Sequence, residues 1–332
     1  PRTATDRSST SSRSVRPTEH LTRVLVTGAS GFAGGHLVAA CAEAGDEVAE
    51  LSRTAGLRVD LLDAAAVRRA VRETAPAAVH HLAALAHVGG SWQEPETYLR
   101  ENVAMTLNVL EAVRAEAPAA AVVVVASGEL YGPPASLPVD ETAPLRPQNP
   151  YAVSKAGADL LAGLYADAHG LRVIRARAFN HAGPGQEPIY AIASFARQVA
   201  AGLVAGEDPV RVVTGNPDVR RDYTDVRDVV RAYRALAEQA EPGAYNVCSG
   251  RTASAAELVA ALGRAAGVEV DHAVDPALRR AHEVTEVRGS YARLHEATGW
   301  EPEIPLEQTL ADTVEWWVHE IRSGRAGAEL HE

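Results

Sequence analysis

From residue 22 onward, short apolar runs alternate with longer stretches in which apolar residues recur every three or four positions. The short runs predict buried strands and the longer stretches predict helices. Strands are expected at 23–27, 47–52, 78–82, 121–126 and 173–179, and helices at 32–44, 63–74, 96–116 and 151–169. Regular alternation of this kind is typical of βαβ units around a parallel sheet. The pattern therefore predicts an α/β fold with a Rossmann-type, doubly wound parallel sheet.

A valine run and a proline-rich segment mark the middle of the expected sheet. The valines from Val122 to Val125 suit a strand that is buried on both faces. Segment 128–150 contains six prolines and is predicted to be a loop. A helix is expected to open directly after it at Tyr151, which places Lys155 one turn further along the same helix face.

Beyond residue 180 the alternation becomes irregular. Helices are expected at 190–204, 226–239, 254–266, 290–298 and 306–322, with strands at 210–214 and 245–247. These elements predict a smaller C-terminal α/β lobe over the carboxyl edge of the sheet, where open α/β folds bind ligands. The expected organisation is an N-terminal extension at 1–20, a dinucleotide-binding domain at 21–180 and a substrate lobe at 181–325, from which some segments return to the first domain.

Composition and charge narrow the functional classes. A formal net charge of −11 disfavours nucleic acid and anionic membranes as main partners. Cys41 and Cys248 stand far apart and outside any metal-type spacing, so neither a disulfide nor a metal site is expected. No apolar run approaches the length of a membrane span, and residues 1–20 lack the apolar segment of a secretory signal. A flexible extension and a cytoplasmic location are expected.

Among the 32 basic residues of the chain, only Lys155 is a lysine. It follows Tyr151 by four positions, and arginine cannot replace a compact ammonium beside a titrating group. Because free tyrosine titrates near pH 10, the ammonium is expected to lower the pKa of the Tyr151 phenol for acid–base work. Ser127, at the end of the fourth expected strand, would orient the substrate oxygen. These three residues predict proton transfer to or from a carbonyl or alcohol.

A glycine triplet at Gly28, Gly31 and Gly34 lies between the first expected strand and helix. Such a turn lets the backbone approach a pyrophosphate, which the helix N-terminus stabilises. After the second strand, Ser52 stands where an acid would bind the ribose of NAD, and Arg53 follows, so NADP(H) is favoured over NAD(H). The predicted cofactor-binding residues are Gly28, Ser30, Gly31, Phe32, Ala33, Gly34, Arg53, Asp60, Leu61, Leu82, Ala83, Ala84, Tyr151 and Lys155.

The glycine triplet, Ser127, and Tyr151 with Lys155 resemble the extended short-chain dehydrogenase/reductases of the nucleotide-sugar epimerase, dehydratase and reductase group across about 22–320. Within that group, the stretches 179–186, 194–198, 220–228 and 245–250 resemble the GDP-4-keto-6-deoxy-D-mannose reductase branch. The resemblance implies a Rossmann domain and a C-terminal lobe that binds a nucleotide sugar. It also implies a homodimer formed through the helices at 96–116 and 151–169.

The resemblance also assigns substrate-binding residues. It implies that Asn180 and Arg221 contact the substrate diphosphate. It places Arg280 and Glu283 around the nucleotide ribose, although Ala281 stands where the group more often has proline. The implied activity is NADPH-dependent reduction of the 4-keto group of a nucleotide-linked 4-keto-6-deoxy sugar, with GDP as the expected nucleotide.

Glu129 keeps two other activities open. A glutamate at this spacing serves related 4,6-dehydratases as a base for the C5 proton, although those enzymes usually carry threonine where this chain has Ser127. A nucleotide-sugar dehydratase or epimerase with tightly bound cofactor is therefore the alternative. A non-catalytic NADP sensor would not need the serine, tyrosine and lysine together, so the combination disfavours that class.

Overall fold

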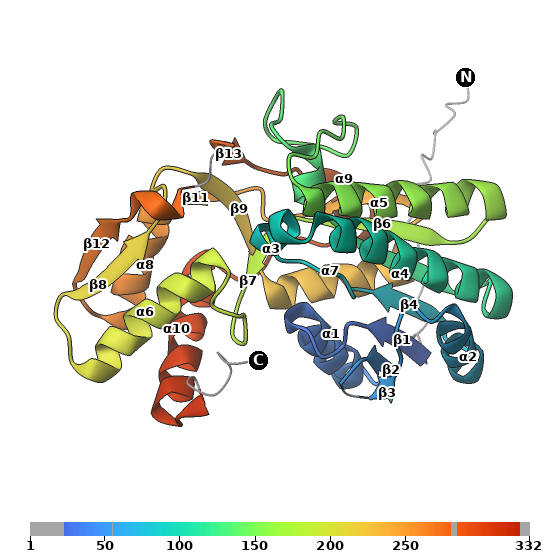
Figure 1. Cartoon of the computed structure of the whole chain (residues 1–332), viewed down its shortest axis with the longest axis horizontal. Helices are drawn as coiled ribbons and strands as arrows, with labels where there is room; N and C mark the ends of the chain where they lie inside the picture. Colours follow the sequence, from blue (N-terminus) through green and yellow to red (C-terminus); the bar gives the residue numbers. More distant parts are fainter. Residues whose placement is uncertain (1–22, 55, 280–283, 326–332) are drawn as a thin grey trace, which may run out of the picture.

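The computed structural model describes residues 23–54, 56–279 and 284–325. Their elements form a large α/β unit and a small lobe that lies at one end of it (Figure 1). The N-terminal extension expected at 1–20 lies outside the described residues, and so do Arg280 and Glu283. In the part of the chain that the structure describes, every helix is too short or too polar to cross a lipid bilayer.

Seven parallel strands form the large sheet, in the order β10-β6-β5-β4-β1-β2-β3. They are β1 (Arg23–Thr27), β2 (Glu47–Ser52), β3 (Leu57–Arg58), β4 (Ala78–His81), β5 (Ala121–Ser127), β6 (Val173–Ala178) and β10 (Gly243–Val247). The strand order reverses between β1 and β4, and open α/β sheets bind ligands outside the carboxyl ends at such a point. The doubly wound sheet predicted from the apolar pattern is confirmed.

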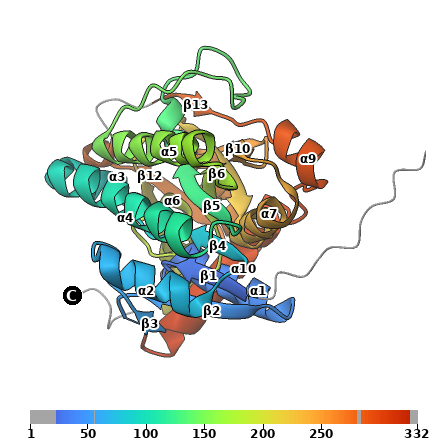
Figure 2. The same cartoon turned by 90° about the vertical axis from the view of Figure 1, so that its right-hand side faces the viewer.

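Helices cover both faces of this sheet (Figure 2). One face carries α1 (Phe32–Glu43), α7 (Val226–Gln239) and α9 (Ala292–Thr298), and the other carries α2 (Ala64–Thr74), α4 (Pro95–Glu116) and α5 (Pro150–His169). Along β5, Val123 joins the first core whereas Val122 and Val124 join the second. The valine run is therefore buried on both faces, as its composition indicates.

The small lobe has its own apolar core. It consists of α6 (Ala191–Ala205), β8 (Val210–Thr214), α8 (Ala255–Ala266), β12 (Val270–Val274) and α10 (Leu306–Arg322). Strands β8 and β12 pair in parallel, and the side chains of Phe195, Leu262 and Trp317 pack together beneath them. The helices expected in this part of the chain are present, with ends that shift by one or two residues.

A third group of short strands joins the two parts. Strand β9 (Arg220–Asp225) pairs with β7 (Asn180–Ala182), β11 (Thr252–Ser254) and β13 (Glu286–Val287). The register places Asn180 opposite Tyr223 and Ala182 opposite Asp225. Strand β7 follows β6 almost directly, so this group lies at the carboxyl edge of the large sheet. The sequence did not predict these strands, because each is short and pairs with partners far away along the chain.

The segment predicted as a loop at 128–150 contains one regular turn. It opens with η1 (Gly128–Tyr131), a 3₁₀ turn whose hydroxyl-bearing Tyr131 is buried and donates to Asn246 Oδ1 at 2.7 Å. Two further short helices were not predicted, α3 (Val88–Gln93) and η2 (Pro276–Leu278). Helix α3 contains two adjacent glycines, which lower helix propensity. The sequence pattern therefore does not predict a helix there.

Candidate active site

The carboxyl end of β5 and the first turn of α5 bring Ser127 and Tyr151 together. Ser127 is the last residue of β5, and its Oγ accepts a hydrogen bond from the Glu129 amide at 3.2 Å. Helix α5 starts at Pro150, and the Asn149 side chain caps it by accepting from the Ala152 amide at 2.7 Å. Proline and asparagine suit these two positions, because they fix the first helical turn. Tyr151 therefore opens a well-defined helix, as predicted, and the Ser127 hydroxyl acts on its phenol by hydrogen bonding.

Lys155 lies one turn after Tyr151 and is only 5 % exposed. Burial lowers the pKa of its ammonium to about 8, and the carboxylate of Asp159 opposes that shift. Asp159 is itself paired with Arg177 of β6, whose guanidinium donates to both carboxylate oxygens at 3.0 and 2.8 Å. The lone lysine is thus a buried cation at the base of the site, and a buried negative charge helps to retain its proton.

The expected effect on Tyr151 is wrong in direction. Burial raises the pKa of the phenol well above its ordinary value, and the hydrogen bond with Ser127 only partly opposes the rise. The nearby side chain of Glu129 adds to the rise. Desolvation is the largest influence because the phenolate, not the phenol, needs solvation. Tyr151 is therefore a neutral phenol at neutral pH, which is the form able to donate a proton.

The glycine turn has the geometry that a dinucleotide pyrophosphate needs. Gly28 has a φ of 72°, and a Cβ there would lie 2.8 Å from the Ala83 amide nitrogen. At Gly34 a Cβ would lie 2.0 Å from the Gly28 carbonyl oxygen, so α1 can approach β1 this closely only with glycine. The N-cap of α1 is Gly31, and no side chain of the described residues caps the helix amides. The helix N-terminus thus offers backbone donors to an anion.

Other predicted cofactor residues lie along the same edge of the sheet. Arg53 is exposed just beyond β2, and Asp60 is exposed beyond β3 with its carboxylate accepting from the Leu62 amide at 2.9 Å. Leu61, by contrast, is buried in the apolar core, so packing accounts for its side chain. Half-buried residues after β4 continue this edge, namely Leu82, Ala83 and Ala84.

Two of the predicted substrate residues, Asn180 and Arg221, lie at one cavity. It is lined by Gly128, Glu129, Ala178, Phe179, Asn180, Arg221, Asp222 and Val287. Asn180 opens β7 and Arg221 belongs to β9, and these short strands face η1 and the end of β6 across the cavity. The carboxylate of Glu129 accepts from Asn149 Nδ2 at 3.3 Å. The cavity therefore joins the predicted diphosphate residues to the residues around Ser127.

Two buried polar residues support this site without having been predicted. His81 at the end of β4 lies between the hydroxyls of Thr27 (2.8 Å) and Thr106 (3.1 Å), and burial lowers the pKa of its imidazole to about 3. Asn102 of α4 donates to Ser154 Oγ at 2.8 Å and binds both backbone groups of Leu85. Asn102 could have been found from the sequence, because it is a polar residue on the apolar face of a predicted helix.

Asp222 is the third residue that sequence reasoning missed. Its buried carboxylate accepts hydrogen bonds from the amides of Ser249, Gly250 and Gly289 and from the Ser249 hydroxyl, at 2.7–3.1 Å. Burial is the largest influence on this carboxyl and raises its pKa, while the four hydrogen bonds oppose the rise. Asp222 therefore ties β9 to the segments that follow β10 and β13, next to the cavity.

A glycine turn before a helix, beside a serine, a tyrosine and a lysine at the neighbouring strand end, defines a Rossmann-type oxidoreductase of the short-chain dehydrogenase/reductase class. Comparison with known families refines this class. Residues 54–313 match the model of the GDP-mannose 4,6-dehydratase family. The chain belongs to this family of nucleotide-sugar enzymes.

Individual relatives agree with the family match. The chain is 41% identical to GDP-6-deoxy-D-mannose reductase of Pseudomonas aeruginosa over 303 residues, which cover 90% of this chain and 98% of the relative. The solved structure of RMD from Pseudomonas aeruginosa complexed with NADPH has a TM-score of 0.82 and 40% identity, covering 90% of this chain and 99% of that one. A Thermus thermophilus UDP-glucose 4-epimerase complexed with NAD has a TM-score of 0.80 and 34% identity, covering 89% and 98%.

Proposed function

We propose that this protein catalyses the NADPH-dependent reduction of the 4-keto group of a GDP-linked 4-keto-6-deoxy sugar. The observation that carries the proposal is a neutral Tyr151 phenol, hydrogen-bonded with Ser127 at the carboxyl edge of a sheet whose glycine turn suits a dinucleotide. The extensive similarity to a GDP-6-deoxy-D-mannose reductase supports both the substrate class and the direction of the reaction. The likeness to a reductase complexed with NADPH, together with Arg53 beyond β2, supports NADP(H) as the cofactor.

The residues of the site suit a cofactor of this kind. The turn from Gly28 to Gly34 leaves room that any Cβ would fill, and the N-terminus of α1 presents amide donors to a pyrophosphate. NADPH, when bound there, supplies the hydride for C4. The Ser127 hydroxyl holds the substrate oxygen, and the Tyr151 phenol donates a proton to that oxygen as negative charge develops on it. The Lys155 ammonium offsets the charge left on the tyrosine.

The sugar nucleotide is proposed to bind beside this cavity. Asn180 and Arg221 reach it from β7 and β9, and the resemblance to the reductase branch makes them diphosphate ligands. A guanidinium matches the geometry of phosphate oxygens, which supports this role for Arg221. Arg280 and Glu283 are proposed as contacts to the nucleotide ribose on the same resemblance.

A 4,6-dehydratase activity is the second candidate, because Glu129 lies in the same cavity as the predicted substrate residues. In a dehydratase this carboxylate would remove the C5 proton. A single assay separates the two activities. A reductase oxidises one NADPH for each GDP-4-keto-6-deoxymannose, which lowers the absorbance at 340 nm, whereas a dehydratase or epimerase regenerates its cofactor and leaves the absorbance unchanged. Retention of all NADPH while GDP-mannose is converted to the keto sugar would refute the reductase proposal.

We also propose that the protein forms a homodimer through α4 and α5. These helices expose five large apolar side chains: Leu99, Leu107, Val153, Leu160 and Leu164. Leu160 and Leu164 are 60 % and 58 % exposed, and they lie one turn apart on α5. Contiguous exposed apolar side chains of this kind mark association surfaces. A two-fold axis between the helices would bury the same stripe from both copies.

A cytoplasmic location is part of the proposal. The two cysteines of the chain, Cys41 and Cys248, are both buried free thiols. Burial raises the pKa of the Cys41 thiol to about 11, which keeps it protonated and unreactive. Unpaired cysteines of this kind suit a reducing compartment.

A further inference from the structure

The ring of Phe32 joins the glycine turn to the strand that carries Asn180. Phe32 is the first residue of α1 and directly follows Gly31. Its ring stacks on that of His181 in β7, with centroids 5.9 Å apart and planes inclined by 7°. His181 is the neighbour of Asn180 along the strand. The turn proposed to bind the pyrophosphate therefore touches the strand proposed to bind the sugar nucleotide.

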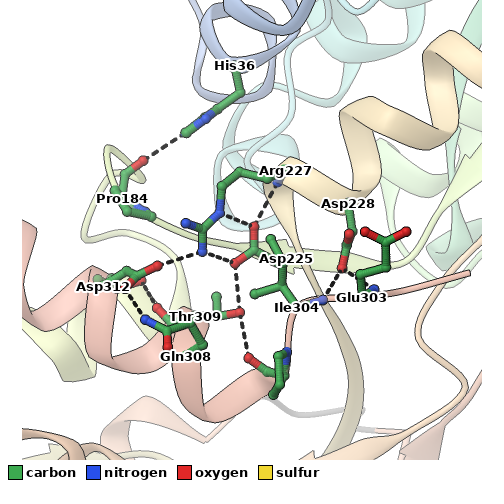
Figure 3. A network of polar contacts seen from close by, with 12 residues as sticks. His36, Pro184, Asp225, Arg227, Asp228, Glu303, Ile304, Gln308, Thr309 and Asp312 are labelled. Carbon is green, nitrogen blue, oxygen red and sulfur yellow. Dashed lines mark hydrogen bonds and ion pairs between the residues drawn. The ribbon is translucent and has the colours of Figure 1, made fainter.

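His36 makes a second contact between the same two segments, one turn further along α1. Its Nε2 donates a hydrogen bond to the carbonyl oxygen of Pro184 at 3.0 Å (Figure 3). Because a carbonyl oxygen only accepts, this ring nitrogen carries a proton. The His36 ring also meets the edge of Phe32, with centroids 5.4 Å apart and planes at 84°. His36 thus fixes both the Phe32 ring and the chain that leaves β7.

The opposite side of β7 is held by α7 and by α10 of the small lobe. Its register on β9 places Ala182 opposite Asp225. The Asp225 carboxylate accepts from Arg227 at 2.8 and 2.7 Å and from the Thr309 hydroxyl of α10 at 2.8 Å (Figure 3). A Cβ at Gly183 would lie 2.7 Å from a methyl carbon of Val226, so the chain also passes close against α7. Strand β7 and the residues after it therefore contact α7, α10 and α1, and the contacts with α1 link them to the glycine turn.

We propose that His36 is a positioning residue that couples the occupation of the glycine turn to nucleotide binding at Asn180 and Arg221. The inference rests on the proposed function, because it takes those two residues as the diphosphate site. A pyrophosphate bound at the N-terminus of α1 fixes Phe32 and His36, and through them β7. The order imposed by the first ligand lowers the entropy cost of binding the second. Such coupling is reciprocal, so each ligand strengthens the other by the same factor.

Calorimetric titration of the full chain with GDP and with UDP, with and without saturating NADP⁺, measures the coupling. In the wild type, NADP⁺ is expected to lower the Kd of the nucleoside diphosphate by about fivefold or more. Saturation with the diphosphate is expected to lower the Kd of NADP⁺ by the same factor. His36→Leu should bring this factor close to one while each ligand alone binds as in the wild type. His36→Gln keeps a side-chain N–H donor and should restore part of the coupling.

His272→Leu is the matched control. His272 also makes one hydrogen bond, to the Thr214 hydroxyl at 2.8 Å, but within the small lobe. This variant should keep the full coupling factor. Equal Kd values with and without NADP⁺ in the wild type would overturn the proposal, and so would an undiminished factor in both His36 variants. Failure of both diphosphates to bind the NADP⁺-saturated wild type would overturn it as well.

The measurement does not depend on turnover. An enzyme that binds GDP cooperatively with NADP⁺ but oxidises no NADPH would contradict the reductase proposal and leave the coupling intact. An active reductase that binds the two ligands independently would contradict the coupling proposal and leave the reductase proposal intact.

Discussion

The Asp159 carboxylate binds the guanidinium of Arg177 through two hydrogen bonds, and both side chains are almost completely buried. The same carboxylate pairs with Arg175 at 3.2 Å. Arg177 in turn donates to the Tyr131 hydroxyl at 2.9 Å, and Tyr131 donates to Asn246 of β10. One buried ion pair therefore joins α5, the helix of Tyr151 and Lys155, to β6, β10 and the turn after β5.

Asp159→Asn is expected to destabilise the protein strongly. The substitution leaves the buried Arg177 charge without its counter-ion, which costs about 3–5 kcal/mol in free energy of unfolding. Urea denaturation followed by circular dichroism measures the change. Glu320→Gln is the control, because its partner Arg325 is largely exposed and such pairs contribute less than about 1 kcal/mol. Similar losses in the two variants would contradict the structural role of Asp159.

Tyr151→Phe is expected to remove turnover and keep cofactor binding. Loss of a general acid lowers kcat by at least about 10², and the phenyl ring preserves the packing at the start of α5. NADPH oxidation at 340 nm and NADPH titration by fluorescence measure the two properties separately. Tyr165→Phe on the same helix removes a hydroxyl that donates to Glu111 and should keep wild-type turnover. The acid role fails if Tyr151→Phe retains more than a tenth of the wild-type kcat.

The pH dependence of the reaction is expected to follow Lys155. Burial holds the pKa of its ammonium at about 8, so the protonated form is lost as the pH rises through that value. The kcat/KM for the keto sugar should therefore fall above about pH 8, because the charge that opposes the developing negative charge on Tyr151 disappears. A flat profile between pH 7 and 9.5 would exclude this role for the lysine.

Stability offers a second check on Lys155 that does not need substrate. The unfolded chain keeps the lysine proton up to the ordinary pKa of 10.5, above that of the folded state. Linkage then makes the free energy of unfolding rise between pH 8 and 10.5, by up to about 3 kcal/mol for this group. Subtracting the profile of Lys155→Met isolates this rise. A salt-bridged lysine would instead make the free energy of unfolding fall over this pH range. A fall would therefore contradict the argument that burial lowers the pKa of Lys155.

The features that could be predicted are those that the chain encodes locally. The glycine turn is predicted because a strand, a turn and a helix follow one another within a few residues. Tyr151 and Lys155 share a helix face because they are four residues apart. Ser127 is found at the end of a valine-rich strand. Each of these depends on spacing along one element, so local patterns are enough to predict the proposed catalytic residues as well as the large sheet.

The remainder depends on contacts between distant segments. Strand β7 pairs with β9, and Asp222 binds amides that follow β10 and β13, so neither has a local signature. The direction of the Tyr151 pKa shift depends on how far the folded chain withdraws the phenol from water. A sequence motif shows which groups are neighbours along the chain. Desolvation depends on all the groups that pack around the phenol in the folded protein. This is why the ammonium beside the tyrosine led to the wrong direction.

Arg53→Ala is expected to reduce the preference for NADPH over NADH. The exposed guanidinium beyond β2 is proposed to bind the 2′-phosphate, and loss of a charge-assisted contact of this kind costs about 1.5–3 kcal/mol, or roughly 10- to 150-fold. The KM for NADPH should rise by that order, while the KM for NADH stays within about twofold. Arg58→Ala, an exposed arginine on neighbouring β3, should leave both values unchanged. An equal rise in the KM values for NADPH and NADH in Arg53→Ala would contradict the proposal that Arg53 binds the 2′-phosphate.

Leu164→Arg is expected to convert the proposed dimer to a monomer. Leu164 and Leu160 are the most exposed apolar residues of α5, and a two-fold interface buries each introduced charge twice. Burying an unpaired guanidinium is costly, so the charge should disrupt association without affecting the helix, whose outer face it occupies. Sedimentation velocity measures the oligomeric state. Val204→Arg, at an exposed valine of α6 in the small lobe, should leave the wild-type dimer intact. The proposed interface through α4 and α5 would be contradicted if Leu164→Arg remained a dimer. It would also be contradicted if the wild type were a monomer at micromolar concentration.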